Sequence, residues 1–340
     1  MTDIPLVDLS MGTDEVQQIL PRLERVLRRG WFVLGPEVRA FEEELAQSAG
    51  RAHAIGVGSG TDALILVLRA LGIGAGDEVV VPDFTAFPTV AAVIEAGATP
   101  VLVDVEATRP LLDLAATLQA VTPRTRAVIL VHLYGICADA TRFARALGPL
   151  GVTLIEDCAQ AQGATLPSGA PVGSAGQAAT FSFYPTKNLG AVGDAGAVVT
   201  DEIALADEIR ALRSHGERGI RYRHEIAARN SRLDDIQAVV LGYRMRSLSS
   251  VVERRRVVSE LYDRKLPVGM YVSHGPGDAP HLAVALSDRR DELSTYLNTL
   301  GIATGCHYPL PVSAQPAMAG GAERPAAHPT PNASSWAARC

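Results

Sequence analysis

Three short segments carry residue types that could do chemistry together. The first is the glycine-rich stretch 56–62 (GVGSGTD), between an expected strand and an expected helix. Small residues at such a turn let backbone N–H groups of the helix N-terminus approach an anion, ordinarily a phosphate. A dinucleotide site fails on context, because Asp77 precedes the next strand, whereas the acid that binds a ribose lies at its far end. Helix capping by Ser59 or Thr61 is an equal alternative.

The second and third segments contain an acid and a lysine. Asp157 lies at the end of an expected buried strand, 152–158 (VTLIEDC), and Gln160 follows it. Because ligands bind at that edge of open α/β sheets, these side chains could hold a cationic ring nitrogen and a neighbouring oxygen, although an Asp satisfied in a turn is the simpler explanation. Lys187 lies in the turn 181–188 (FSFYPTKN), where an amine among apolar groups loses its proton and attacks a carbonyl. A lone lysine is usually a solvated surface group.

In this order along the chain, the three segments would supply the three contacts that pyridoxal phosphate requires in an enzyme. The cradle would anchor the phosphate and the lysine would form a Schiff base with the aldehyde. The acid would keep the pyridine nitrogen protonated, so that the ring withdraws electrons. Together the segments predict a pyridoxal-phosphate enzyme, although each alone is weak evidence.

Strand-like and helical patterns alternate between residues 53 and 158. Strands are expected in the stretch HAIGVGSG from residue 53 and at 78–82, 100–105, 126–135 and 152–158. Helices are expected between them at 61–71, 85–96, 112–120 and 139–149. This rhythm predicts a mostly parallel sheet with crossover helices on both faces.

The flanking segments are expected to be more varied. Helical patterns cover 14–29, interrupted by Pro21, and 36–48; later come strands at 178–184 and 195–200, a helix at 203–213 and a long helix at 234–261. The last part shows weak strands at 269–275, 281–287 and 303–308, a helix near 288–300, and an aperiodic tail, 319–340, expected to be loop. These patterns predict a large domain, 1–250, and a smaller domain, 251–340.

Composition excludes several classes of protein. The 340 residues include 31 basic and 37 acidic side chains, a net charge of −6, so neither nucleic acid nor an anionic membrane is an expected partner. Four cysteines, Cys137, Cys158, Cys306 and Cys340, lie far apart without CxxC pairs, which argues against a disulfide framework and a metal site. An acidic N-terminus and the lack of an apolar run near 18 residues indicate a cytoplasmic protein that spans no membrane.

Seven stretches together resemble the DegT/DnrJ/EryC1/StrS family of sugar aminotransferases, within the fold-type I pyridoxal-phosphate superfamily. They are GWFVLGPEVRAFEEELA, SGTDAL, TPRTRAVILVHLYG, EDCAQAQGA, FSFYPTKNLGAVGDAGAVVT, NSRLDDIQAVVL and CHYPLPVSAQPAM, in order from about residue 4 to residue 318. The resemblance implies an α/β fold with a mostly parallel seven-stranded sheet flanked by helices, and a smaller α+β C-terminal domain.

The resemblance also implies catalytic and cofactor-binding roles. Lys187 would form the Schiff base, Asp157 would pair with the pyridine nitrogen, and Gln160 would lie beside the phenolic oxygen of the cofactor. An amino donor, glutamate in most of the family, would displace Lys187, whose freed amine would move a proton between the substrate and the cofactor. The amine would then pass to a nucleotide-linked keto sugar with ping-pong kinetics.

The phosphate and substrate contacts are implied in the same way. Gly60 and Thr61 by backbone, and Ser182 by hydroxyl, would bind the phosphate. Asn230 of a neighbouring subunit would reach the same phosphate, which implies a homodimer with shared active sites. Substrate-facing loops would carry His215, His307 and Tyr308, with surface or packing roles an equal alternative for the histidines.

One loop narrows the range of expected substrates. GWFVLGPE looks more like members acting at C3 of a hexose than at C4, which favours a 3-keto-6-deoxyhexose on dTDP. An amino-cyclitol aminotransferase and a non-catalytic regulatory or scaffold member are the alternatives. A 3-dehydrating branch of the family has histidine where this chain has Lys187, so the lysine argues against it.

Two features depart from the family pattern. Many members place an aromatic ring over the cofactor where this chain has Ala86, with Phe84 and Phe87 nearby, so the stacking role has no assigned residue. The family also continues past PTPNASSWAARC with a strand and a terminal helix. The resemblance therefore implies that the smaller domain is truncated.

Overall fold

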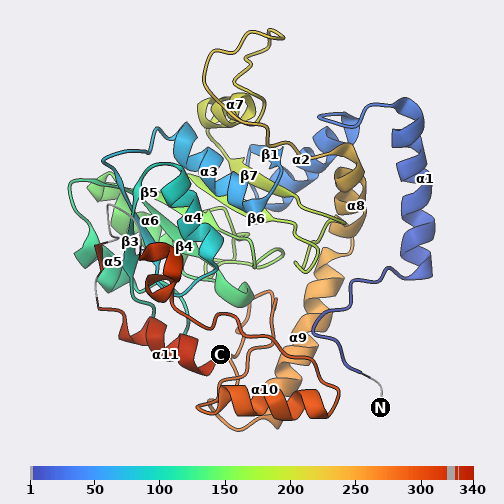
Figure 1. Cartoon of the computed structure of the whole chain (residues 1–340). Coiled ribbons are helices and arrows are strands. Elements are labelled where there is room, and N and C mark those ends of the chain that lie inside the picture. The colour runs from blue at the N-terminus through green and yellow to red at the C-terminus, as the bar shows by residue number, and fades with distance from the viewer. Residues whose placement is uncertain (1–2, 320–325, 328) are drawn as a thin grey trace.

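A central β-sheet lies among helices in the computed structural model, which describes residues 3–319, 326–327 and 329–340 (Figure 1). The strand order is β1-β7-β6-β5-β4-β2-β3-β8. Strands β2 to β6 pair in parallel, as does β8 with β3, whereas β7 is antiparallel to β1 and β6. The strands are β1 (His53–Val57), β2 (Glu78–Pro82), β3 (Thr99–Val103), β4 (Thr125–Val131), β5 (Thr153–Asp157), β6 (Ala178–Ser182), β7 (Gly196–Thr200) and the two-residue β8 (Ala326–Ala327). The predicted mostly parallel sheet of seven main strands is confirmed.

The sheet is the hydrophobic core of the molecule. All residues of β2 and β7 are buried, as expected of strands covered on both faces. Helix α3 buries six consecutive residues, 63–68, because it packs against the sheet and against two other helices. The helices that follow or connect the strands are α3 (Gly60–Ala70), α4 (Phe87–Glu95), α5 (Leu114–Ala120), α6 (Ala140–Leu147) and α7 (Ile203–Leu212).

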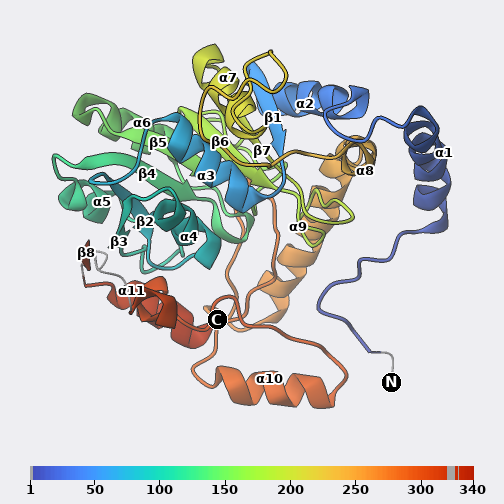
Figure 2. The same cartoon turned by 45° about the horizontal axis from the view of Figure 1, so that its top comes forward.

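The N-terminal helices are α1 (Thr13–Arg29) and α2 (Pro36–Ser48). Figure 2 shows α1 and the segment before it standing away from the sheet. Helix α1 packs against α8 (Asp235–Met245) through Ile19 and Val26. The predicted interruption at Pro21 is wrong: the helix continues through this exposed residue.

One long helix was expected over 234–261, and this prediction is wrong in one respect. The structure has two helices, α8 and α9 (Leu248–Lys265), with a break at residues 246–247. Ser247 has φ −105° and ψ 1°, outside the helical region. The apolar spacing continues across the break, so periodicity alone could not reveal it. Helix α9 then runs below the sheet toward α10 (Arg290–Thr299) (Figure 1).

The weak strands expected in the C-terminal part are wrong. Within the described residues these segments form only isolated bridges, Tyr271 with Ala285 and Ile302 with Ile4. The N–H groups of Val272 and Leu286 join the first two segments to each other, whereas the N–H groups of Ala279 and His281 donate to the turn after β4. Such long-range pairing leaves no alternating signal in the sequence.

The prediction of a loop over 319–340 is also wrong in part, because α11 (Pro331–Arg339) is helical and β8 pairs with β3. Residues 320–325 and 328 lie outside the described residues. Asp104 caps α11 by accepting from the backbone N–H groups of Asn332, at 3.1 Å, and Ala333, at 2.8 Å. Trp336 donates its indole N–H to the carbonyl of Glu106 at 3.0 Å. Thr330 at the N-cap and Pro331 at the first helical position are local start signals, although the capping hydrogen bonds come from the distant Asp104. None of the described helices is long and apolar enough to cross a bilayer.

Candidate active site

The glycine-rich turn after β1 meets the end of β6. Ser59 caps α3, because its Oγ accepts the N–H of Asp62 at 3.0 Å. Gly60 and Thr61 form the first positions of the helix, where N–H groups have no partner inside the helix. A Cβ at Gly60 would lie 2.6 Å from Cβ of Ser182, so only glycine allows this close approach. The helix terminus and the Ser182 hydroxyl together form a cradle for an anion.

A cavity of about 310 Å³ opens between this cradle, the start of α4 and the ends of β5 and β6. It brings together six of the predicted site residues: Gly60, Thr61, Asp157, Gln160, Ser182 and Lys187. The other lining residues are Ser59, Leu64, Thr85, Ala86, Pro88, Thr89, Val131, Ala159, Tyr184 and Asp194.

Asp157 is buried at the carboxyl end of β5. Its Oδ1 accepts the N–H of Ala159 at 3.1 Å, and its Oδ2 accepts the hydroxyl of Thr89 at 2.9 Å. Burial raises the pKa of Asp157, while these two hydrogen bonds and the nearby Lys187 oppose the rise. Thr89 was not predicted as a site residue. The threonines at positions 85 and 89, four residues apart at the start of α4, are the signal that could have found it.

Lys187 lies in the turn after β6, and its backbone N–H donates to the carbonyl of Tyr184 at 2.9 Å. Burial lowers the pKa of Lys187 to about 8, against the opposing effect of the Asp157 carboxylate. A substantial fraction of the amine is therefore neutral near physiological pH. A neutral, enclosed amine can attack a carbonyl carbon or accept a proton.

Gln160 links two distant parts of the chain. Its Oε1 accepts the N–H of Tyr134 at 2.8 Å, and its Nε2 donates to the hydroxyl of Tyr308 at 3.0 Å. The Tyr134 hydroxyl donates to the carbonyl of His307. These contacts hold the 307–308 loop near the cavity. Burial raises the pKa of Tyr308 to about 12, and burial, then Lys187, lowers that of His307, so both side chains are neutral at pH 7.

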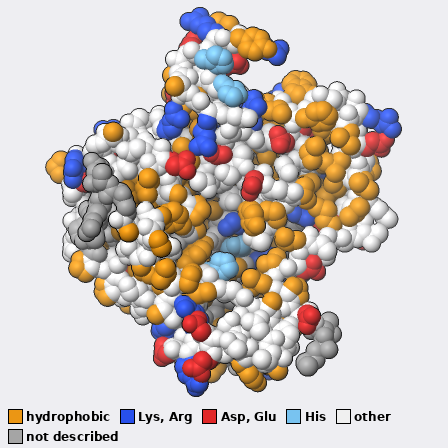
Figure 3. All heavy atoms as spheres, viewed as in Figure 1, with side chains coloured by type: hydrophobic (Ala, Val, Ile, Leu, Met, Phe, Trp, Pro, Cys, Tyr) orange, Lys and Arg blue, Asp and Glu red, His pale blue; other side chains and the backbone are white. Residues whose placement is uncertain are grey.

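Two predicted residues lie elsewhere in this chain. His215 and Asn230 are exposed and do not line the cavity. They belong to the segment 214–230, called the arm below, which projects beyond α7 (Figure 1). A backbone bridge joins Ser214 to Asn230 at its base. Figure 3 shows histidine and Lys or Arg side chains gathered on this projection.

Ala86 precedes α4 and lines the cavity. Phe84 does not line it, because its buried ring packs edge-on against the rings of Tyr134 and Tyr308, at centroid distances of 6.5 Å and 6.3 Å. Phe87 packs against the hydrophobic core. Tyr184, which is half exposed, supplies the aromatic side chain among the described residues that line the cavity.

The model of the DegT/DnrJ/EryC1/StrS aminotransferase family matches residues 13–340. The chain belongs to this family. It is 43% identical to dTDP-3-amino-3,4,6-trideoxy-alpha-D-glucose transaminase of Streptomyces venezuelae, over 98% of this chain and 89% of the relative. It is 44% identical to the erythromycin biosynthesis sensory transduction protein EryC1 of Saccharopolyspora erythraea, over 93% of this chain and 88% of the relative.

Solved structures agree with this membership. The chain resembles S. venezuelae DesV in complex with a ketimine intermediate, with a TM-score of 0.94 and 42% identity over 100% of this chain and 92% of that one. Other similar structures hold the cofactor in its pyridoxal or pyridoxamine form. The predicted family, fold, aminotransferase class and pyridoxal-phosphate cofactor are confirmed.

The residues of this aminotransferase fit the cofactor. The close approach of Gly60 and Ser182 leaves backbone N–H groups and a hydroxyl for the phosphate. A buried carboxylate, Asp157, suits a protonated ring nitrogen, and the amine of Lys187, whose pKa is lowered, suits an aldehyde. The cavity thus offers an anion cradle, an acid and a nucleophile.

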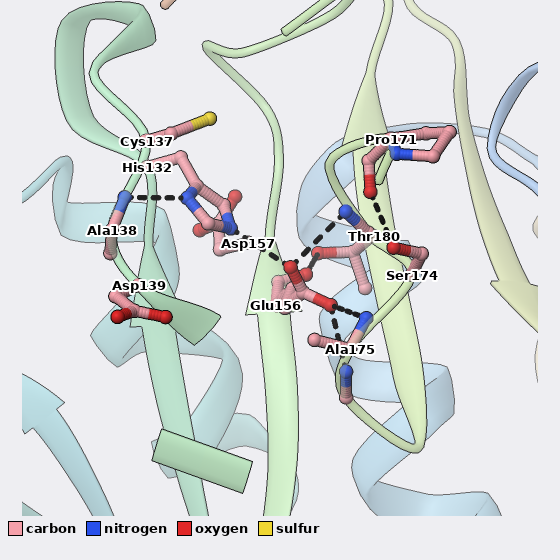
Figure 4. Close-up of polar contacts among 12 residues, drawn as sticks. His132, Cys137, Ala138, Asp139, Glu156, Asp157, Pro171, Ser174, Ala175 and Thr180 are labelled. Carbon is pink, nitrogen blue, oxygen red and sulfur yellow. Dashed lines mark hydrogen bonds and ion pairs between the residues drawn. The ribbon is translucent and has the colours of Figure 1, made fainter. Parts of the chain in front are cut away.

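Near Asp157, this aminotransferase has a buried polar cluster made of His132, Glu156 and Cys158. Figure 4 shows how His132 and Glu156 lie. His132 accepts the N–H of Ala138 at Nδ1, at 3.1 Å, and its Nε2 lies 3.1 Å from Glu156. Glu156 also accepts three backbone N–H groups of the loop 173–176. The ligand atoms of His132 and Glu156 are therefore already engaged in holding loops onto β5.

Proposed function

We propose that this chain transfers an amino group from glutamate to the C3 keto group of a dTDP-linked 3-keto-6-deoxyhexose. The observation that carries the proposal is that the half-buried Lys187 and the buried Asp157 line one cavity beside an anion cradle. The name of the Streptomyces venezuelae relative, a dTDP-3-amino sugar transaminase, supports the sugar and the position. The GWFVLGPE loop points to the same position.

Binding of the cofactor would involve both ends of the cavity. Gly60 and Thr61 would donate backbone N–H groups to the phosphate, and Ser182 would donate its hydroxyl. Asp157 would pair with the ring nitrogen, and Thr89, which already donates to this carboxylate, would fix its orientation. Gln160 would contact the oxygen on the ring. A group held at three points cannot rotate in the cavity.

Lys187 would act first as a nucleophile and then as an acid and base. Pyridoxal phosphate, when bound, contributes an aldehyde for the amine and a ring that withdraws electrons. Once the donor amine displaces Lys187, its Nζ would take a proton from the carbon that bears the amino group and return a proton at the reacting carbon of the cofactor. A pKa of about 8 suits both directions of transfer near neutral pH.

His307 and Tyr308 would contact the sugar. Both lie on the loop that Gln160 and Tyr134 hold near the cavity. Because burial keeps the His307 ring neutral, one ring nitrogen can donate and the other can accept a hydrogen bond from a sugar hydroxyl. Such paired polar contacts would select among sugars by the positions of their hydroxyl groups.

The active form would be a homodimer with shared sites. Asn230 would bind the cofactor phosphate of the partner subunit, and His215, on the same arm, would face the partner's substrate. The exposure of both residues, away from their own cavity, supports this arrangement. Exposed apolar side chains on and after α1, including Leu20, Leu27 and Trp31, also suit a covered surface.

The test is a product assay with three acceptors. Purified protein, pyridoxal phosphate and glutamate are mixed with a dTDP-3-keto-6-deoxyhexose, its 4-keto isomer or a keto-cyclitol, and products are identified by mass spectrometry. We expect amination of the 3-keto sugar and equimolar 2-oxoglutarate. Preference for either other acceptor would contradict the proposed substrate. Absence of any aminated product would favour a regulatory member, as the name of the EryC1 relative suggests for that protein.

A further inference from the structure

A second cavity, of about 320 Å³, lies between α9 and the segment 280–283, outside the site described above. Its lining residues are Val251, Arg254, Arg255, Val258, Ser259, Tyr271, Pro280, His281, Leu282 and Ala283. Among these described residues there are two arginines and a histidine but no acid. The cavity therefore has cationic walls without an anionic side chain.

Arg255 is a partly buried guanidinium without a carboxylate partner. Its Nη1 donates to the carbonyl of His281 at 2.7 Å, which is a neutral acceptor. No ion pair joins it to any acid in the described ranges, and burial lowers its pKa. Buried charges in proteins are normally paired, because an unpaired charge loses its hydration without compensation. The remaining N–H groups of Arg255 thus lack an anion.

Arg254 shares this feature at the exposed side of the cavity. It makes no ion pair or hydrogen bond within the part of the chain that the structure describes. Other arginines of α9 do have acids: Arg256 lies 3.7 Å from Glu253, and Arg264 lies 3.9 Å from Glu260. The two unpaired arginines of the helix are those that line the cavity.

His281 forms a buried part of the cavity wall. Its side chain is only 7% exposed, and its Nδ1, which has no hydrogen-bond partner, is closed to solvent. The other polar side chains of the wall are satisfied, since Ser259 accepts the hydroxyl of Tyr271 at 3.0 Å and lies 3.0 Å from His274. The charged donors that line the cavity are therefore those of the two arginines.

We propose that this cavity binds an oxyanion, the carboxylate or phosphate group of a small molecule, through Arg254 and Arg255. Guanidinium groups present paired N–H donors that match both carboxylate and phosphate oxygens. The site is separate from the phosphate cradle at Gly60. It lies next to the catalytic turn, because Asn188 donates its side-chain amide to the carbonyl of Ala279 at 3.2 Å.

The test is direct binding to the cofactor-loaded enzyme, in which the phosphate cradle is already filled. Isothermal titration at constant ionic strength uses inorganic phosphate and, separately, succinate, which has neither an amine nor a keto group to react. We expect at least one probe to bind the wild type. Arg254→Gln and Arg255→Gln should each weaken that binding about tenfold or more, since each removes a charged donor.

Arg264→Gln, on the same helix but paired with Glu260, is the matched control and should bind as the wild type does. Binding of phosphate alone or succinate alone identifies which group the site takes. Because Arg254 is exposed, its variant keeps the test valid even if Arg255→Gln fails to fold. No binding of either probe, or equal binding by wild type and both cavity variants, would overturn the proposal. Neither result depends on aminotransferase turnover.

Discussion

Lys187 and Asp157 line one cavity, and desolvation shifts the pKa of each toward its neutral form. The pKa of Lys187 falls to about 8, and that of Asp157 rises. Each group also favours the charged form of the other, so removing either one changes the protonation of its partner.

The lowered pKa of Lys187 predicts that the stability of the protein depends on pH. In the cofactor-free protein the pKa of Lys187 is about 8 when folded and near 10.5 when unfolded. Between these values the unfolded chain binds more protons, so the free energy of unfolding rises with pH. Relative to Lys187→Met, the wild type should gain roughly 2–3 kcal/mol from pH 7 to pH 10, measured by urea unfolding. A difference that stays constant with pH would contradict the shift.

Asp157→Asn should leave the fold intact and change two measurements. Loss of the carboxylate removes the group that opposes the effect of burial on Lys187, so the amine should titrate below about pH 8 in the cofactor-free protein. Transamination should fall by about 10²–10³, because the ring nitrogen loses its charged partner. NMR titration of the lysine and a turnover assay check the two effects. A variant with normal turnover would exclude Asp157 from the cofactor contact.

Gly60→Ala should weaken cofactor binding. Its Cβ would lie 2.6 Å from Cβ of Ser182, so the helix terminus must move away from the end of β6 and the cradle widens. Gly148→Ala is the control, because nothing lies within 4 Å of a Cβ there. Equilibrium dialysis with pyridoxal phosphate should show about tenfold weaker binding for Gly60→Ala only. Equal affinities of the Gly60→Ala and Gly148→Ala variants would contradict a role of the cradle in binding the cofactor phosphate.

Gln160→Ala should destabilise the protein and loosen the 307–308 loop. The buried N–H of Tyr134 loses its acceptor, which costs about 1–3 kcal/mol. Tyr308→Phe removes only the hydroxyl end of the same link, so its loss of stability should be smaller. Thermal unfolding of both variants and KM for the keto sugar are the readouts. An unchanged KM in both would show that the loop does not face the substrate.

Most of the sheet and the centre of the site could be predicted from the sequence. The apolar runs and the turns after them are local signals, and they place Asp157 and Lys187 at strand ends that meet in a parallel sheet. Thr89 was missed because its role depends on a contact with a different strand. The adjacency of Arg255 and His281 likewise exists only in the folded chain.

The incorrect predictions of secondary structure share a physical cause, which is contact between residues far apart in the chain. The cap of α11 comes from Asp104, and the expected C-terminal strands form one isolated bridge, Tyr271 with Ala285, and bond in part to the turn after β4. Local patterns do not report such contacts between distant residues. The break between α8 and α9 leaves the apolar spacing intact. The domain boundary at residue 250 and the roles of His215 and Asn230 stay predictions, since the arm would act on a second copy of the chain.

The central claim is that Lys187 holds the cofactor, and the sequence allows a sharp test because the other lysine of the chain is Lys265, exposed at the end of α9. The protein is mixed with pyridoxal phosphate, reduced with borohydride, digested and mapped by mass spectrometry. We predict one cofactor mass on the Lys187 peptide, retained in Lys265→Ala and abolished by glutamate added before reduction. Label on Lys265, or none on Lys187, would contradict the account.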